Sequence, residues 1–249
     1  YRAITRMSGR TCRHLGVTGG DGRILGALSA RDLLKQRAGD AMSLGDTIEA
    51  AASPAELGRI WESLTVVAAS LANEGVDPRN TAAIVSHELR ALTRRATELA
   101  ELKMIDDGWG PPPQPYAMLV LGSGGRGESL LAMDQDNAII FDAGESGSET
   151  DKWFERLGGI AADTLDHVGV SYCQGGIMAK NPEWRMDAKH WRATVETWIG
   201  KGKAEDILNS DIFFDARPVF GDTGLGDALR LDAMRLAQGS KTFLQAMAI

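Results

Sequence analysis

The chain has 249 residues, of which 43% are hydrophobic and 24% charged, and its formal net charge is −7. This composition indicates a globular protein with a hydrophobic core and excludes a wholly disordered chain. The acidic balance disfavours duplex nucleic acid as a partner, and no apolar run reaches the roughly 18 residues that cross a bilayer. The two cysteines, Cys12 and Cys173, form no metal or redox motif. We therefore expect a cytoplasmic protein without a membrane segment.

The first 40 residues predict a helix, two strands joined by a turn, and a second helix. The expected bounds are 3–10 for the first helix and His14–Thr18 and 23–28 for the strands, with Ser29 as the N-cap of the second helix. The chain begins at Tyr1 and not at Met, so we expect it to be a piece of a longer protein.

This run resembles the end of a CBS domain. The matching residues are His14-Leu15-Gly16-Val17, Asp21-Gly22-Arg23-Ile24-Leu25-Gly26 and Ser29-x-x-Asp32-Leu33-Leu34. The resemblance implies that Ser29 and Asp32 hold the ribose of an adenine nucleotide where two complete motifs pair. The residues alone also allow a structural role, in which Ser29 caps the helix and Asp32 lies in its positive first turn.

Residues 41–108 predict a pair of helices. The first begins at a capping box, Ser53-Pro54-Ala55-Glu56, and the second begins at Asp77-Pro78. Apolar residues repeat at steps of three and four along the second helix, which predicts a seam for a neighbouring helix. These residues are Val85, Leu89, Leu92, Ala96 and Leu99. We interpret the region as a helical hairpin that precedes the next domain.

Residues 109–222 alternate strands with helices, a pattern that predicts an α/β (or α+β) core. The expected strands are 116–121, 138–141, 168–173 and 212–214. The expected helices are 151–167, one within 183–199 and a short one at 205–208. Residues from 225 onward predict a helix, and we assign 223–249 to the start of a C-terminal helical region.

One glycine cluster after the first of these strands allows three interpretations. In the first, Gly122, Gly124 and Gly127 form the fingerprint of a dinucleotide fold, and Asp142 binds the ribose. The helix from Glu128 would then have only about nine residues, which is short for that fold. In the second interpretation, the glycines form a structural turn that exposed acids follow.

The third interpretation is nucleotidyl transfer. Backbone N–H groups at Gly122 and Ser123 can surround phosphate oxygens where the strand ends and a helix begins. Asp134 and Asp136 are two positions apart, so on an extended strand they share a face and converge on one metal site. Oxygen ligands without a His or Cys cluster indicate Mg²⁺ or Mn²⁺, which would polarise the α-phosphate.

The spacing from Gly122-Ser123 to Asp134-x-Asp136 resembles that of the nucleotidyltransferases of the DNA polymerase β superfamily. The form Gly122-Ser123-Gly124-Gly125-Arg126-Gly127-Glu128 is similar to the branch of PII-protein uridylyltransferase and glutamine synthetase adenylyltransferase. With the helical pair and the CBS segment before it, the chain looks like a bacterial signalling group with nucleotidyltransferase domains. The resemblance implies a mixed-sheet core in which Asp134 and Asp136 are catalytic metal ligands.

The resemblance also implies a third carboxylate on a later strand. Asp215, in the sequence Asp215-Ala216-Arg217, is the expected residue and would complete the metal cluster and help to activate the acceptor hydroxyl. Asp211 is the competing choice. Asp215 alternatively forms only an ion pair with Arg217.

Three cations are candidates for binding a triphosphate. Arg126 lies in the loop itself, and Lys180 and Arg185 lie on either side of residues 181–184. The latter two cations alternatively only neutralise the acidic site.

We therefore expect an enzyme that transfers a nucleoside monophosphate from an NTP to a hydroxyl acceptor, such as one on a regulatory protein, and that forms a homodimer. The competing hypothesis is a non-catalytic sensor, in which the nucleotidyltransferase fold binds nucleotide and relays the state of the CBS segment. A nicotinamide-dependent dehydrogenase is the third hypothesis.

Overall fold

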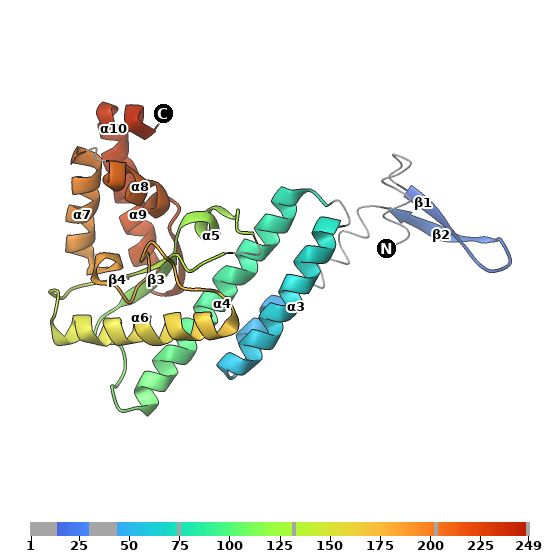
Figure 1. Ribbon diagram of the computed structural model, residues 1–249, viewed down its shortest axis with the longest axis horizontal. Helices are drawn as coiled ribbons and strands as arrows, with labels where there is room; N and C mark the ends of the chain where they lie inside the picture. The colour runs from blue at the N-terminus through green and yellow to red at the C-terminus, as the bar shows by residue number, and fades with distance from the viewer. Residues whose placement is uncertain (1–13, 30–43, 74–75, 131–132, 202–203, 248–249) are drawn as a thin grey trace.

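The computed structural model describes residues 14–29, 44–73, 76–130, 133–201 and 204–247 (Figure 1). At the N-terminal side, β1 (His14–Thr18) and β2 (Ile24–Ser29) form the predicted antiparallel hairpin. Gly22 takes a left-handed φ of 79° in the turn between them, which favours glycine. The helices expected before and after this hairpin, including Asp32, lie outside the described residues.

The predicted helical pair is present as α3 (Pro54–Asn73) and α4 (Pro78–Asp106). One half of the capping box before α3 is formed, because Ser53 Oγ accepts the Glu56 N–H. Glu56 Oε2 accepts the N–H of Ala52, one residue before the N-cap. Asp77 caps α4 by accepting the Arg79 N–H. Residues 44–50 are also helical and pack with both helices around Ile48.

The core is a mixed four-stranded sheet in the order β5 (Arg185–Asp187), β4 (Asn137–Phe141), β3 (Tyr116–Val120) and β6 (Arg217–Gly221). Strands β4 and β5 are parallel, and the other neighbours are antiparallel. This sheet and its helices confirm the predicted α/β class.

Alternate residues of the central strands face two helical layers, because side chains alternate along a strand. On one face, Met118 and Ile139 pack against α4 and against α6 (Glu149–Val168), which contributes Phe154. On the other face, Leu119 and Ile140 pack in a cluster with residues of the last four helices. Figure 1 shows these helices together on one side of the sheet. These helices are α7 (Ala188–Lys201), α8 (Ala204–Phe214), α9 (Thr223–Gly239) and α10 (Lys241–Met247).

Two predicted strands are wrong. Residues 212–214 form the end of α8, which also contains the short helix expected at 205–208, and Phe213 packs against Trp191 and Trp198. A short apolar run fits a buried helix turn as well as a strand, and here packing decides. The expected strand at 168–173 is instead the end of α6, its cap Gly169 and an irregular segment with one isolated bridge from Ser171.

The helix that the dinucleotide interpretation requires after Glu128 is absent from the described residues 128–130 and 133–136. A short helix, α5 (Gly122–Arg126), lies within the glycine cluster itself and ends at Gly127, whose φ is 87°. The short helix η1 (Pro182–Trp184) precedes β5. Among the described helices, none has both the length and the hydropathy needed to cross a membrane.

Candidate active site

The glycine loop, residues 122–127 at the end of β3, is packed against two of the predicted site residues, Asp136 and Asp215. Gly122 has a left-handed φ of 52°, and a Cβ at this position would lie 2.7 Å from Oδ2 of Asp136. A Cβ on Gly125 would lie 1.9 Å from the carbonyl oxygen of Asp215. Glycine at position 125 therefore lets the main chain at Asp215 approach the loop, and glycine at position 122 accommodates both the left-handed backbone and the Asp136 carboxylate.

Side chains of helix α4 hold this loop through two hydrogen bonds. The guanidinium of Arg90 donates a hydrogen bond of 2.7 Å to the carbonyl oxygen of Gly124. Ser86 Oγ accepts the backbone N–H of Ser129 at 2.8 Å, just after the loop. The upstream helical hairpin thus holds the loop in place. The apolar residues of α4 predicted only packing against another helix and did not indicate this role.

Asp134 and Asp136 converge with a cysteine. One carboxylate oxygen of each acid and the sulfur of Cys173 all lie within 4.8 Å of one another. Asp136 immediately precedes β4, whereas Asp134 forms a parallel bridge with Ser171. The burial changes across the group, from exposed Asp134 through half-buried Asp136 to buried Cys173. The spacing of the cysteines excluded a metal motif, so the contribution of Cys173 was missed.

The charges in this group are coupled. Burial raises the pKa of Asp136, and a hydrogen bond from the Cys173 thiol and the charge of Arg126 oppose this rise, while the charge of Asp134 adds to it. Burial also raises the pKa of Cys173 to about 11, with Asp136 contributing. The sulfur is therefore a protonated thiol at neutral pH and acts as a donor toward Asp136.

Asp215 follows α8 and pairs with Arg126, and not with Arg217, which was the alternative partner to a metal ion. The Arg126 guanidinium is bonded to the Asp215 carboxylate and lies 3.1 Å from Glu128. Burial raises the pKa of Asp215, and Arg126 opposes the rise, while Asp211 adds to it by like charge. The charge of Arg126 also opposes the rise in the pKa of Asp136, so this guanidinium acts on both acids. Asp215 itself is not in the group that Asp134, Asp136 and Cys173 form.

The two remaining predicted cations have different surroundings. The Lys180 ammonium lies 3.8 Å from the centre of the Tyr172 ring, and Tyr172 directly precedes Cys173 in the sequence. The Arg185 side chain is 2% exposed, pairs with Asp151 at 2.8 Å and donates to two carbonyl oxygens of residues 179 and 180. Its bonding capacity serves the interior, so we leave Arg185 out of the phosphate site.

The sequence matches a family described as "Putative nucleotidyltransferase DUF294" over residues 62–205, which is more than half of the chain. The chain belongs to this family. The DUF294 match contains α4, the glycine loop, both metal-ligand candidates and Cys173, whereas Asp215 lies beyond its end. No curated protein shows significant similarity to the chain.

Nucleotidyltransferases typically use a divalent metal ion, and the donor atoms of this DUF294 protein suit one. The carboxylates of Asp134 and Asp136 converge, and oxygen ligands of this kind favour Mg²⁺ or Mn²⁺. The negative charge of Asp134 contributes to the raised pKa of Asp136. A cation between the two carboxylates would relieve this like-charge repulsion.

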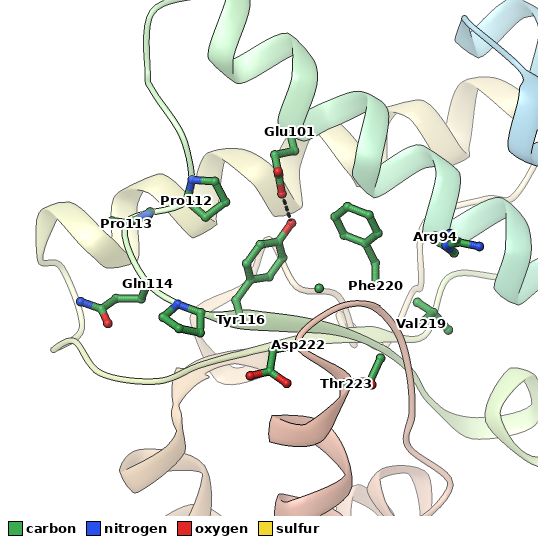
Figure 2. A pocket seen from close by; sticks show the side chains of 12 residues that line it. Arg94, Glu101, Pro112, Pro113, Gln114, Tyr116, Val219, Phe220, Asp222 and Thr223 are labelled. Carbon is green, nitrogen blue, oxygen red and sulfur yellow. Dashed lines mark hydrogen bonds between the residues drawn. The ribbon is translucent and has the colours of Figure 1, made fainter.

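A large cavity of about 920 Å³ lies at the opposite end of β3 from the glycine loop. Figure 2 shows the Tyr116 hydroxyl pointing to Glu101, to which it donates a hydrogen bond of 2.6 Å, with Phe220 nearby. None of the predicted site residues of this DUF294 chain lines the cavity. The candidate site is thus defined by its acids and its loop, and not by this cavity.

Proposed function

We propose that this protein is a metal-dependent nucleotidyltransferase that moves a nucleoside monophosphate from an NTP to a hydroxyl acceptor and releases pyrophosphate. The observation that carries this proposal is the packing of one glycine loop against the Asp136 carboxylate and the main chain of Asp215, whose own carboxylate pairs with Arg126 of the loop. A phosphate chain on the loop would lie beside the acids that hold the metal. Membership of a nucleotidyltransferase family supports the same reaction class.

Each residue has a role in this proposal. Asp134 and Asp136 would hold Mg²⁺ or Mn²⁺, which supplies positive charge at the α-phosphate as the bond to pyrophosphate breaks. The backbone N–H groups at Gly122 and Ser123 would bind phosphate oxygens, because the first N–H groups of a helix have no partner within it. Arg126 and Lys180 would add charge-assisted contacts to the same phosphates.

Asp215 is the third carboxylate of the proposal, and its ion pair suggests how it enters the reaction. A triphosphate competes with Asp215 for the Arg126 guanidinium, because both offer oxygen anions to one planar donor. Asp215 released in this way would complete the metal ligands and accept the proton of the attacking hydroxyl. The exposed Asp211, which acts on Asp215 through its charge, is the alternative third acid.

The finer identity rests on resemblance. We propose a hydroxyl on a regulatory protein as the acceptor, as for PII uridylyltransferase, and a cytoplasmic location, with which the unpaired Cys173 thiol agrees. The division at residues 40, 108 and 222 and the homodimer belong to the same proposal. So does a CBS segment over residues 1–40 that binds adenine nucleotide when complete, for which the β1–β2 hairpin is the only described support.

The test is pyrophosphate release with each of the four NTPs, Mg²⁺ or Mn²⁺, and a panel of candidate protein acceptors. We expect one NTP to be consumed by the wild type together with one acceptor, and the acceptor to gain the mass of one nucleotide. The Asp134→Asn variant should bind NTP but release no pyrophosphate. Release at the wild-type rate by this variant would contradict the proposal.

A non-catalytic nucleotide sensor is the second candidate. The observation that favours it is the pairing of Asp215 with Arg126, which neutralises the third acid and leaves only two carboxylates beside Cys173. A sensor would bind NTP with Mg²⁺, as measured by calorimetry, and release no pyrophosphate with any acceptor. A nicotinamide cofactor should bind in neither case, because Asp142 is an exposed residue beyond the far end of β4.

A further inference from the structure

Cys173 is held against Asp136 by main-chain pairing of two segments far apart in the sequence. The Gln135 N–H donates to the Ser171 carbonyl at 2.9 Å, and the Asn137 N–H donates to the Ile177 carbonyl at 3.1 Å. These bonds lie on either side of Asp136 in one segment and of Cys173 in the other. The backbone thus determines which side chains meet.

Further contacts lock this pairing. The Asn137 side chain accepts the Ala179 N–H at 2.8 Å, and the amide of Gln135 donates to the Ala162 and Val170 carbonyls at 2.9 Å each. Gln135 and Asn137, on either side of Asp136, are both buried. The backbone at Asp136 is therefore fixed, and the orientation of its side chain is the main conformational freedom that remains.

The bonding of the Cys173 sulfur is directional. The sulfur lies within 4.8 Å of a carboxylate oxygen of Asp136, and the S–H is the proton donor of this pair. Hydrogen bonding from the thiol opposes the rise in the pKa of Asp136. Cys173 is 8% exposed, so water does not replace this partner. A thiol has one proton to donate, and here that proton is directed to Asp136.

We infer that Cys173 is a positioning residue, whose thiol holds one side of the Asp136 carboxylate and turns its remaining lone pairs toward the metal. The inference rests on the proposed function, since it concerns the metal site of that reaction. Hydrogen bonds behind a metal-binding carboxylate fix its orientation, and their loss typically weakens metal binding by about 10–100-fold. Mg²⁺ and Mn²⁺ prefer oxygen ligands to sulfur, so in this role the sulfur is not itself a metal ligand.

The first test measures Mn²⁺ affinity by electron paramagnetic resonance, without NTP and without turnover. We expect Cys173→Ala to weaken Mn²⁺ binding about 10–100-fold. Cys173→Ser keeps a donor of similar size and should stay within about threefold of the wild type, which a merely structural loss would not rescue. Thermal melts without metal establish that each variant is folded.

The second test does not depend on any variant at position 173. Cys12 is the only other cysteine, so Cys12→Ala leaves the Cys173 thiol as the single source of the infrared S–H stretching band. We expect this band to persist when the protein is saturated with Mn²⁺. We also expect Co²⁺ in place of Mn²⁺ to give no sulfur-to-metal charge-transfer band.

The outcomes separate the two proposals. Loss of the S–H band or a charge-transfer band would make Cys173 a ligand and overturn the positioning role. Equal Mn²⁺ affinity in folded Cys173→Ala and wild type would overturn the inference and leave the proposed function intact. A wild-type protein that binds no Mn²⁺, with or without NTP, would overturn both.

Discussion

Gly122 and Asp136 are in such close contact that the loop has no room for a side chain at position 122. Oδ2 of Asp136 lies 2.7 Å from the place of a Cβ there, and the carbonyl of Asp136 accepts the N–H of Leu121 at 2.9 Å. The glycine loop and Asp136, the proposed metal ligand, are therefore one structural unit, and a side chain at position 122 would displace the Asp136 carboxylate.

Gly122→Ala should displace the Asp136 carboxylate and weaken Mn²⁺ binding at least about tenfold, because the new methyl group occupies its place. The left-handed φ of 52° adds about 1–2 kcal/mol of backbone strain. Gly127→Ala is the matched control, since its φ is 87° but its Cβ would meet nothing within 4 Å. Both variants should lose similar stability in urea unfolding, and equal Mn²⁺ affinity in the two would refute this coupling.

Arg126→Ala should raise the Kd for NTP by about 10–100-fold, because a charge-assisted contact to phosphate is worth about 1.5–3 kcal/mol. The salt dependence of NTP binding should also become weaker. Arg156→Ala is the control. Arg156 is also a partly exposed arginine, but it lies on α6, where its guanidinium stacks over the ring of Trp109. Calorimetric titrations at two salt concentrations measure both effects, and unchanged NTP affinity would remove Arg126 from the site.

Asp136→Asn should reduce pyrophosphate release about a thousandfold, since the metal site contributes several kcal/mol to the transition state. Without metal, the variant should be at least as stable as the wild type, because burial and the charge of Asp134 disfavour the ionised acid. Asp142→Asn, at the other end of β4, should leave both properties unchanged. Equal activity of Asp136→Asn and the wild type would place the chemistry elsewhere.

Glu88 on α4 should make the stability of the protein depend on pH. The residue is 1% exposed, its Oε2 has no hydrogen-bond partner in the described part of the chain, and burial raises its pKa from 4.5 to about 7. The folded protein thus holds this proton more tightly than the unfolded chain does. Its contribution to stability is complete below about pH 4.5 and is lost as the pH rises through about 7.

Glu88→Gln should remove this dependence and raise the free energy of unfolding at about pH 8 by roughly 2–3 kcal/mol. Urea unfolding at about pH 5 and about pH 8 measures the difference. Glu62→Gln, at an exposed position of α3, should change neither value by more than about 0.5 kcal/mol. A wild-type protein that is more stable at the higher pH would show that Glu88 is not the controlling group.

Local sequence patterns were enough to predict most of the regular elements. The capping box at Ser53, the cap at Asp77 and the spacing of apolar residues predicted α3 and α4, because these signals involve neighbours within one or two turns. The order of the glycine loop and the two acids likewise indicated the reaction class, which the family match supports at the coarser level of nucleotidyltransferase.

Contacts between distant segments decided the rest. Phe213 is helical because its ring stacks against Trp191 in the core. Arg185 is buried because its guanidinium forms an ion pair with Asp151, which lies 34 positions earlier. Cys173 reaches Asp136 only through the pairing of two irregular segments, and no local pattern marks that pairing. A sequence motif identifies the groups that can react, whereas burial and partners are properties of the packed chain and determine how each group is used.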